Sequence, residues 1–161
     1  MASILETDSV TKKFGGFTAV DNVTLKVDPG EIRFIIGPNG AGKSTFFKLV
    51  IGYHSPNSGT ILYKGQNVEK LKLYERINLG MGVKFQAPSV FSELTVLENL
   101  SLANNREESL NINDLLNDFA LENDKNNLAG DLSHGKKQWL DIALSTISKP
   151  DLVFLDEPTA G

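Results

Sequence analysis

Residues 37–45 have the side chains and the spacing needed to hold a polyphosphate. Their order, Gly-Pro-Asn-Gly-Ala-Gly-Lys-Ser-Thr, fits the phosphate-binding loop pattern G-x-x-x-x-G-K-[ST] without a mismatch. Glycines let the backbone curl so that several N–H groups point into one hollow. In such a loop Lys43 reaches the β- and γ-phosphates of a nucleotide, and the Ser44 hydroxyl binds Mg²⁺. The predicted nucleotide-binding residues are Gly37, Pro38, Asn39, Gly40, Ala41, Gly42, Lys43, Ser44 and Thr45.

Two adjacent carboxylates, Asp156 and Glu157, follow the apolar stretch 151–155. Successive side chains of a strand point in opposite directions, so the two acids have different tasks available. One can hold Mg²⁺ through water beside the phosphate loop, and the other can orient or deprotonate an attacking water. Acidic residues in an ordinary strand-to-loop turn would look the same, but a phosphate loop in the same chain favours the functional interpretation.

Two other polar positions are weaker signals by themselves. Gln86 ends a predicted strand at 80–85, where an amide suits a ligand of Mg²⁺ or of the attacking water, although strand-end glutamines are usually just solvated. Ser133 stands where the N-cap of a helix belongs, and a helix N-terminus is a second place for anionic oxygens. A routine capped helix has the same pattern.

The elements around the phosphate loop are predicted from periodicity. A buried strand at 31–36 runs into the loop and a helix at 44–51 leaves it, which is the context that the loop pattern requires. Before them come strands at 3–11 and 18–27, the second of which alternates apolar and polar residues. Further strands are predicted at 60–64, 80–85 and 151–155, and helices at 71–78, 95–103, 112–119 and 133–147.

Helix 95–103 is predicted to start at a Thr95 cap and to bury Leu97, Leu100 and Leu102. The later helix has a clear buried stripe at i, i+3, i+4 and i+7. This stripe consists of Leu140, Ala143, Leu144 and Ile147.

Phe14 precedes two glycines in the connection between the first two strands. An exposed aromatic side chain there could stack on adenine, since base–aromatic stacking contributes about 1–3 kcal/mol. A core position in the sheet is the equally compatible alternative.

The composition narrows the functional classes. The chain has 161 residues, of which 40% are hydrophobic, and this suits a single domain with a core. Its net charge of −4 provides no broad basic field for nucleic acid. It has no cysteine, which excludes disulfides and thiolate metal sites. No apolar run is long enough to span a bilayer, so a membrane role would come through a partner.

In their order and spacing, these motifs closely resemble the nucleotide-binding subunits of ATP-binding cassette (ABC) transporters over almost all of residues 3–161. Residues 37–45 correspond to the family's Walker A loop, residues 132–136 to its signature, and residues 152–157 to Walker B with the following glutamate. The resemblance implies that Glu157 acts on the attacking water and that Asp156 is a Mg²⁺ ligand.

The resemblance also assigns the weaker positions. Gln86 matches the Q-loop glutamine, with a catalytic role and a role as Mg²⁺ ligand. Phe14 falls at the adenine-stacking aromatic position. Ser133 and Gly135 are expected to contact the γ-phosphate. His134 and Lys136 replace the usual glycine and glutamine of the signature, and Lys136 would add positive charge near that phosphate.

The implied fold is α/β, with a P-loop NTPase (RecA-like) core, an N-terminal antiparallel β subdomain and a short α-helical subdomain. Residues 1–161 would form a single incomplete domain whose C-terminal part is missing. The β subdomain is expected at 1–30 and 58–65, the core at 31–57, 66–86 and 150–161, and the helical subdomain with the signature helix at 87–149.

The implied activity is Mg²⁺-dependent ATP hydrolysis by two such subunits in a head-to-tail dimer. The dimer would drive membrane permease subunits at the cytoplasmic face of the inner membrane, served indirectly by a solute-binding protein. Residues 14–23 and 132–140 look most like the branched-chain amino acid and urea/amide uptake group. Because the chain ends just after Walker B, weak ATP binding and little turnover are expected. The alternatives are a soluble non-transport ABC ATPase, a catalytically inactive fragment, or an exporter subunit.

Overall fold

The computed structural model describes residues 2–87, 89–104 and 110–156. They divide after Leu79 into two compact units, unit 1 up to that residue and unit 2 from Gly80 onward. Glu157 lies outside the described residues.

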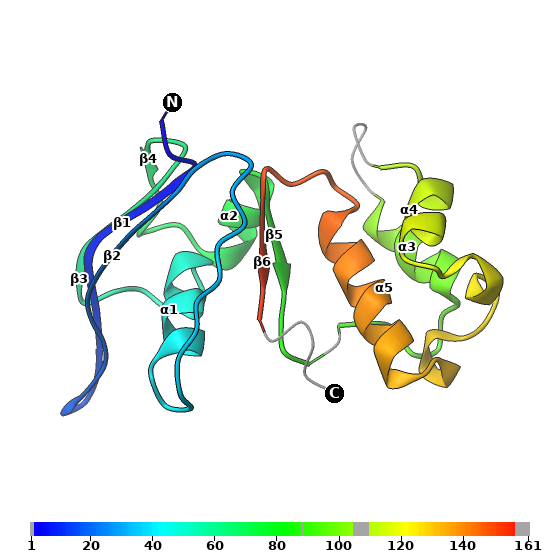
Figure 1. Ribbon diagram of the computed structural model, residues 1–161, viewed down its shortest axis with the longest axis horizontal. Helices are drawn as coiled ribbons and strands as arrows, with labels where there is room; N and C mark the ends of the chain where they lie inside the picture. Colours follow the sequence, from blue (N-terminus) through cyan, green and yellow to red (C-terminus); the bar gives the residue numbers. More distant parts are fainter. Residues whose placement is uncertain (1, 88, 105–109, 157–161) are drawn as a thin grey trace. The chain divides into compact units, whose positions relative to one another are not determined.

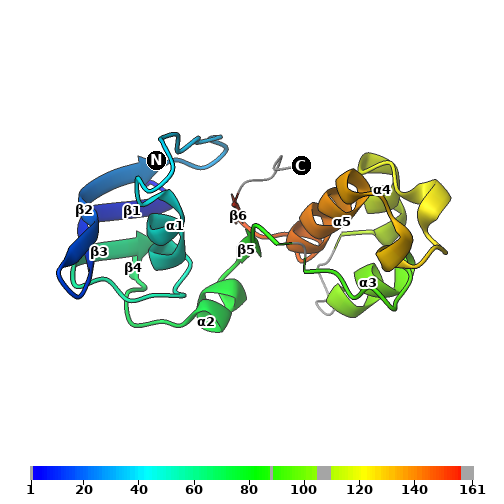
Figure 2. The ribbon, with the colours of Figure 1, turned by 90° about the horizontal axis from the view of Figure 1, so that it is seen from below.

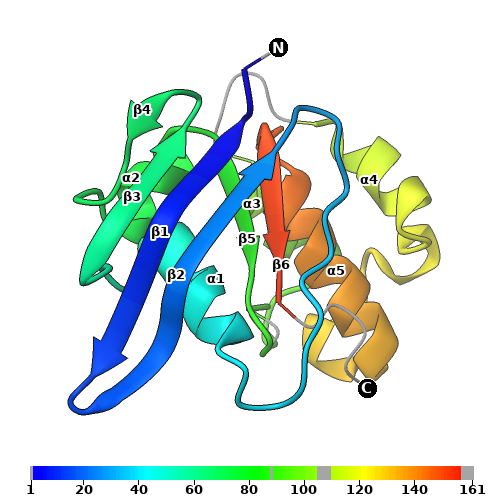
Figure 3. The same ribbon diagram turned by 60° about the vertical axis from the view of Figure 1, so that its left-hand side comes forward.

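Unit 1 is built on an antiparallel sheet with the strand order β2-β1-β3-β4 (Figure 3). Its strands are β1 (Leu5–Phe14), β2 (Phe17–Val27), β3 (Ser58–Tyr63) and β4 (Gln66–Asn67). The strands predicted at 3–11, 18–27 and 60–64 are confirmed with shifted ends. In the second half of β2, Val23, Leu25 and Val27 are less exposed than Thr24 and Lys26, as the alternation predicted.

Helix α1 (Lys43–Val50) follows the phosphate loop and lies against one face of this sheet (Figure 2). Phe46, Leu49 and Val50 form its buried side. The short helix α2 (Leu73–Asn78) places Arg76 beneath the end of α1, where the side chain is fully buried. The predicted helices at 44–51 and 71–78 are therefore confirmed.

The strand predicted at 31–36 is wrong. These residues form no regular element, and none of the strands in the described part of unit 1 pairs with them. Ile32, Phe34 and Ile36 are 83%, 78% and 90% exposed. An apolar run becomes a strand only where a neighbouring strand accepts its backbone hydrogen bonds, and here no such neighbour is in place.

Unit 2 has a parallel pair of strands, β5 (Met81–Lys84) and β6 (Leu152–Leu155), and three α-helices within its described residues. Helix α5 (His134–Thr146) lies between this pair and the helices α3 (Val96–Ala103) and α4 (Ile112–Asp118) (Figures 1 and 2). Two 3₁₀ turns, η1 (Glu122–Asp124) and η2 (Ala129–Asp131), lead into α5. The helical core consists of Val96, Leu100, Leu115, Leu116, Leu121, Ala129, Leu132, Leu140, Ala143 and Ile147.

The predicted stripe of α5 is confirmed, with Leu140, Ala143 and Ile147 almost fully buried. The predicted inner face of α3 is partly wrong. Leu100 is buried, but Leu102 is 59% exposed, and Asn99 is buried instead. The Asn99 amide donates to the carbonyl of Phe91 and accepts the N–H of the same residue, so a polar side chain occupies a position that apolar periodicity does not predict. None of the helices in the described ranges has the length and apolar character needed to cross a membrane.

The N-terminus of α3 is closed by a reciprocal capping box. The Thr95 hydroxyl accepts the N–H of Glu98 at 3.1 Å, and the Glu98 carboxylate accepts the N–H of Thr95 at 2.7 Å. The backbone N–H of Thr95, and then its hydroxyl, lower the pKa of Glu98. The folded state therefore binds a proton at Glu98 less readily than the unfolded state does.

We expect this carboxylate to make the stability pH-dependent in acid. A lowered folded-state pKa gives stability that is complete above the unfolded pKa and is lost as pH falls through the folded pKa. From about pH 5 to about pH 3, the free energy of unfolding should fall more steeply for the wild type than for Glu98→Gln. Urea unfolding at a series of pH values measures both slopes, and parallel curves would contradict the prediction.

Candidate functional site

The phosphate loop of unit 1 ends in a left-handed turn that leads directly into α1. Gly42 is the N-cap of α1 with φ of 85°, and Gly40 has φ of 83°. Such backbone conformations favour glycine because a side chain would clash with the main chain. Within the described chain, no acceptor takes the N–H groups of Gly42, Lys43 and Ser44. These donors at a helix N-terminus form a site for an anion.

The ammonium of Lys43 rests on the loop itself. It donates to the carbonyl oxygen of Gly37 at 2.6 Å and to that of Pro38 at 2.9 Å. Phosphate oxygens carry negative charge, so they attract an ammonium more strongly than neutral carbonyl oxygens do. Lys43 is thus held at the loop in a place where an arriving phosphate can exchange with these carbonyls.

A cavity of about 580 Å³ adjoins the loop within unit 1. Its walls come from β2, from residues 33–36 and from the start of α1, and they include Ala19, Val20 and Lys43. This volume lies in the range of about 300–1,000 Å³ that small-molecule sites usually have. Both a cation and apolar surface border it, as a ligand with charged and aromatic parts requires.

Phe14 lies at the tip of the β1–β2 hairpin and is 46% exposed, so the alternative of a core position in the sheet is wrong. Its ring makes an edge contact with His54 at 5.6 Å between centroids, and the Lys12 ammonium is 5.2 Å from its centroid. Burial, followed by the charges of Lys12 and Lys48, lowers the pKa of His54. The His54 ring is therefore neutral at pH 7 and suited to packing against an aromatic ring.

Sequence reasoning missed His54 and Lys12 as neighbours of Phe14. Lys12 lies two residues before Phe14, and its ammonium donates to the carbonyl of Ser55 at 2.7 Å. This bond joins the hairpin to the connection after α1, which carries His54. Because the contact spans 43 residues of sequence, periodicity gives no signal for it.

Ser44 and Thr45 lie in the first turn of α1, directly after the phosphate loop. The Ser44 side chain is exposed, and its hydroxyl makes no hydrogen bond within the described ranges. An unengaged hydroxyl oxygen at the loop fits the oxygen donors that Mg²⁺ prefers.

Unit 2 brings Gln86 and Asp156 to one edge of its strand pair. Because β5 and β6 run parallel, with Lys84 opposite Leu155, the residues after both strands emerge at the same edge. The backbone N–H of Asp156 donates to the carbonyl of Lys84 at 3.0 Å. Carboxylate and amide oxygens at the carboxyl ends of parallel strands are well placed for a ligand.

Ser133 and Gly135 are exposed at the N-terminus of α5. The Ser133 hydroxyl caps the helix by accepting the N–H of Lys136 at 3.4 Å, which confirms the predicted cap. The expectation for Lys136 needs correction. Its ammonium pairs with the Asp124 carboxylate at 2.5 Å, so its charge is largely compensated and is not presented freely at the helix start.

Gly42→Ala should disrupt the phosphate loop far more than Gly40→Ala. A Cβ at position 42 would lie 2.1 Å from the carbonyl oxygen of Ala19, whereas one at position 40 would meet nothing within 4 Å. Both substitutions carry the cost of a left-handed backbone, about 1–2 kcal/mol. We expect about 3 kcal/mol or more for Gly42→Ala because backbone must also move. Urea unfolding measures both, and equal losses would contradict the prediction.

A glycine-rich loop that leads into a helix and offers free N–H donors beside a lysine defines the class of P-loop nucleotide-binding proteins. A family model described as ABC transporter matches residues 20–160. The chain therefore belongs to the ABC transporter family.

Curated relatives support this assignment. The chain is 34% identical over 179 residues to the high-affinity branched-chain amino acid transport ATP-binding protein LivG of Escherichia coli K12, covering 98% of this chain and 70% of LivG. It is 38% identical over 166 residues to the probable multidrug ABC transporter ATP-binding protein YbhF of the same organism. That match covers 99% of this chain and 28% of YbhF.

Solved structures show the same fold. A nucleotide-free ATP-binding cassette from an ABC transporter matches with a TM-score of 0.85 and 28% identity, covering 99% of this chain and 70% of that one. The ADP conformation of another such cassette matches with a TM-score of 0.87 and 28% identity, covering 100% of this chain and 71% of that one. The predicted fold class, a P-loop NTPase with an antiparallel β subdomain and helices, is confirmed.

Proposed function

We propose that this chain binds ATP with Mg²⁺ and hydrolyses it to power an ABC transporter. The main support for ATP binding is the set of free N–H donors at the start of α1, which lie beside the loop-bound ammonium of Lys43. Polyphosphate suits this arrangement, because its oxygens can take the helix donors and the ammonium together. The match to the ADP conformation of an ATP-binding cassette supports a nucleotide as the source of that phosphate.

In this proposal each remaining residue has one task. The exposed ring of Phe14 stacks on adenine, and its contact with His54 keeps it in place. Ser44, Gln86 and Asp156 hold Mg²⁺, which supplies compensation for the phosphate charge when bound. Glu157 orients and deprotonates the attacking water. Ser133 and Gly135 contact the γ-phosphate held by a second subunit in a head-to-tail dimer.

The transported solute is proposed to be an amino acid or a urea-like amide. The likeness to LivG supports an amino acid, and the sequence at 132–140 supports the urea/amide branch. The ATPase would sit at the inner face of the membrane on permease subunits that a solute-binding protein supplies.

Calorimetric titration of the chain with ATP, with and without Mg²⁺, tests the proposal. Saturable binding that Mg²⁺ strengthens would support it, as would release of phosphate that depends on Mg²⁺. Binding of Mg²⁺-ATP that is no tighter than binding of inorganic phosphate would contradict it, because adenine stacking and the β- and γ-phosphates would then contribute nothing.

A further inference from the structure

Helix α5 has a second buried face, and it is polar. Gln138, Asp141 and Ser145 are 7%, 3% and 9% exposed, at a spacing of i, i+3 and i+7 that places them on one side of the helix. This side faces the end of β5, because the Asp141 carboxylate lies 3.9 Å from the ammonium of Lys84, the last residue of that strand. Burying polar groups destabilises a fold unless they are paired, so we expect partners for the side chains on this face.

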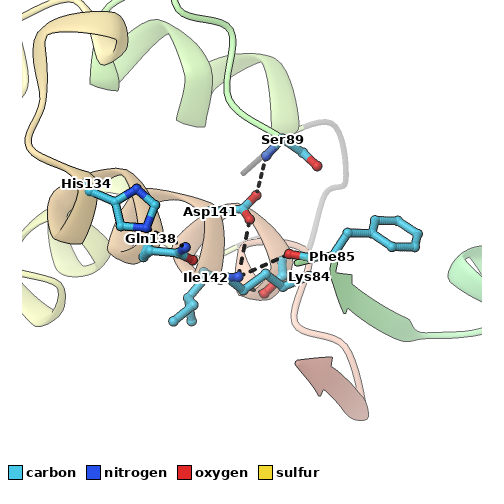
Figure 4. Close-up of polar contacts among 8 residues, drawn as sticks. Lys84, Phe85, Ser89, His134, Gln138, Asp141 and Ile142 are labelled. Carbon is cyan, nitrogen blue, oxygen red and sulfur yellow. Dashed lines mark hydrogen bonds and ion pairs between the residues drawn. The ribbon is translucent and has the colours of Figure 1, made fainter. Parts of the chain in front are cut away.

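Lys84, the last residue of β5, extends toward this face and is fully buried. Its ammonium lies 3.9 Å from a carboxylate oxygen of Asp141 and donates to the carbonyl of Phe85 at 3.1 Å (Figure 4). The two charges are buried together in unit 2, so removing either one would leave the other in the interior without its partner, which is strongly destabilising. This pair holds the end of β5 to the middle of α5.

The other carboxylate oxygen of Asp141 binds the backbone that follows Gln86 in the sequence. It accepts the backbone N–H of Ser89 at 3.1 Å (Figure 4). One carboxylate therefore engages Lys84, two residues before Gln86, and Ser89, three residues after it. The exposed glutamine projects from a segment that is secured at both ends to one helix.

We propose that Lys84 and Asp141 are positioning residues that clamp the Gln86 segment to α5. The inference rests on the proposed function, in which Gln86 serves the nucleotide site. Ser133 caps α5 and Gly135 lies in its first turn, about 12 and 9 Å along the helix from Asp141, so the clamp fixes Gln86 relative to those residues. The buried pair thus joins a segment that the proposed function assigns to the chain's own Mg²⁺-ATP to one that it assigns to the ATP held by a second subunit.

The absence of cysteine from the sequence allows a direct test with single nitroxide labels. A label at Ala87→Cys reports on the Gln86 segment, and one at Asn113→Cys on the exposed side of α4 serves as the control. Adding Asp141→Asn or Lys84→Met should speed the motion of the label at 87 about twofold or more and leave the label at 113 unchanged. Equal mobility at 87 in all backgrounds would overturn the proposal.

A double variant separates positioning from mere stabilisation. Replacing both charges in Lys84→Met/Asp141→Leu removes the buried ions together, and such apolar pairs often match or exceed the stability of the ion pair. The N–H of Ser89 still loses its acceptor. We expect the melting temperature to recover while the label at 87 stays mobile. If mobility recovers together with stability, the pair is only structural and the proposal is wrong.

Steady-state ATP hydrolysis gives the functional readout. Asp141→Asn should lower kcat about tenfold with KM for ATP within about twofold, because the substitution displaces Gln86 and leaves the phosphate loop intact. Asp141→Glu should restore much of the loss, and Asp118→Asn on the exposed side of α4 should have no effect. Unchanged kcat in Asp141→Asn would overturn the inference. A wild-type chain that binds Mg²⁺-ATP no tighter than inorganic phosphate would instead count against the proposed function, and the label at 87 would still decide whether the clamp exists.

Discussion

Lys43→Ala should weaken ATP binding by this chain about a hundredfold or more, with little change in its melting temperature. Among the described residues, the Lys43 ammonium donates only to the carbonyls of Gly37 and Pro38, 2.6 and 2.9 Å away. Contacts of an ammonium with phosphate oxygens contribute about 1.5–3 kcal/mol each. Two such contacts correspond to a hundredfold or more in affinity, at about 1.4 kcal/mol for each factor of ten. Calorimetric titration with Mg²⁺-ATP measures the loss.

Lys70→Ala is the matched control, because Lys70 is an exposed lysine of the same unit whose side chain has no partner within the described ranges. It removes the same charge from unit 1 without touching the loop, so its affinity for ATP should stay close to that of the wild type. A loss for Lys43→Ala no larger than for Lys70→Ala would show that general charge, and not the loop ammonium, attracts the nucleotide.

Arg76→Met should be among the most destabilising single substitutions in unit 1, by about 4 kcal/mol or more. The Arg76 guanidinium donates to the carbonyls of Leu49 and Val50 at 3.0 and 2.5 Å, and to those of Leu71 and Glu69 at 3.0 and 3.3 Å. Two of these carbonyls belong to the end of α1, where helix carbonyls have no partner within the helix. Methionine fills the volume but donates nothing. The carbonyl of Leu49 keeps the N–H of Gly52 at 3.2 Å, whereas the carbonyl of Val50 loses the donor that Arg76 provides.

The guanidinium of Arg76 keeps its charge although burial opposes it. Burial lowers the pKa of Arg76 to about 10, so the guanidinium remains charged at neutral pH. A cation at the carboxyl end of α1 interacts favourably with the helix dipole. Urea unfolding should show the loss for Arg76→Met. Arg33→Met is the control, since the exposed Arg33 pairs only with Glu31 within the described residues and should cost less than about 1 kcal/mol. Similar losses for the two variants would contradict this account.

Several features of the candidate site follow from local sequence alone. The phosphate loop is one, because glycines at 40 and 42 permit the positive φ angles that free the N–H groups of α1. The Ser133 cap of α5 and the capping box at Thr95 are others. In each case the interacting atoms lie within a few residues of one another, so residue type and spacing suffice to predict them.

Residues 31–36 show where such prediction fails. Their apolar pattern is that of a buried strand, yet the segment is exposed and unpaired within the described part of unit 1. Periodicity reports which side chains avoid water, but a strand is defined by hydrogen bonds to another strand. The apolar pattern therefore predicts that this segment tends to form a strand. The tertiary structure decides whether a neighbouring strand accepts its backbone hydrogen bonds.

Tertiary structure likewise decides the contacts of Arg76, which stabilise unit 1, and those of Asp141, which form the clamp on the Gln86 segment. Arg76 reaches carbonyls 26 and 27 residues away, and Asp141 accepts an N–H from Ser89, 52 residues away. A charged residue at the end of the apolar strand β5 was the one available signal for Lys84, but it does not indicate a partner.

The sequence by itself thus determined the phosphate loop, the caps and the family, because each depends on residue types at short, constant spacing. Only the tertiary structure decided that residues 31–36 form no strand, that Arg76 is buried and that Lys84 pairs with Asp141. The physical reason is that a buried charge or an unpaired strand is stabilised by whatever atoms the fold brings beside it, and local spacing does not specify those atoms.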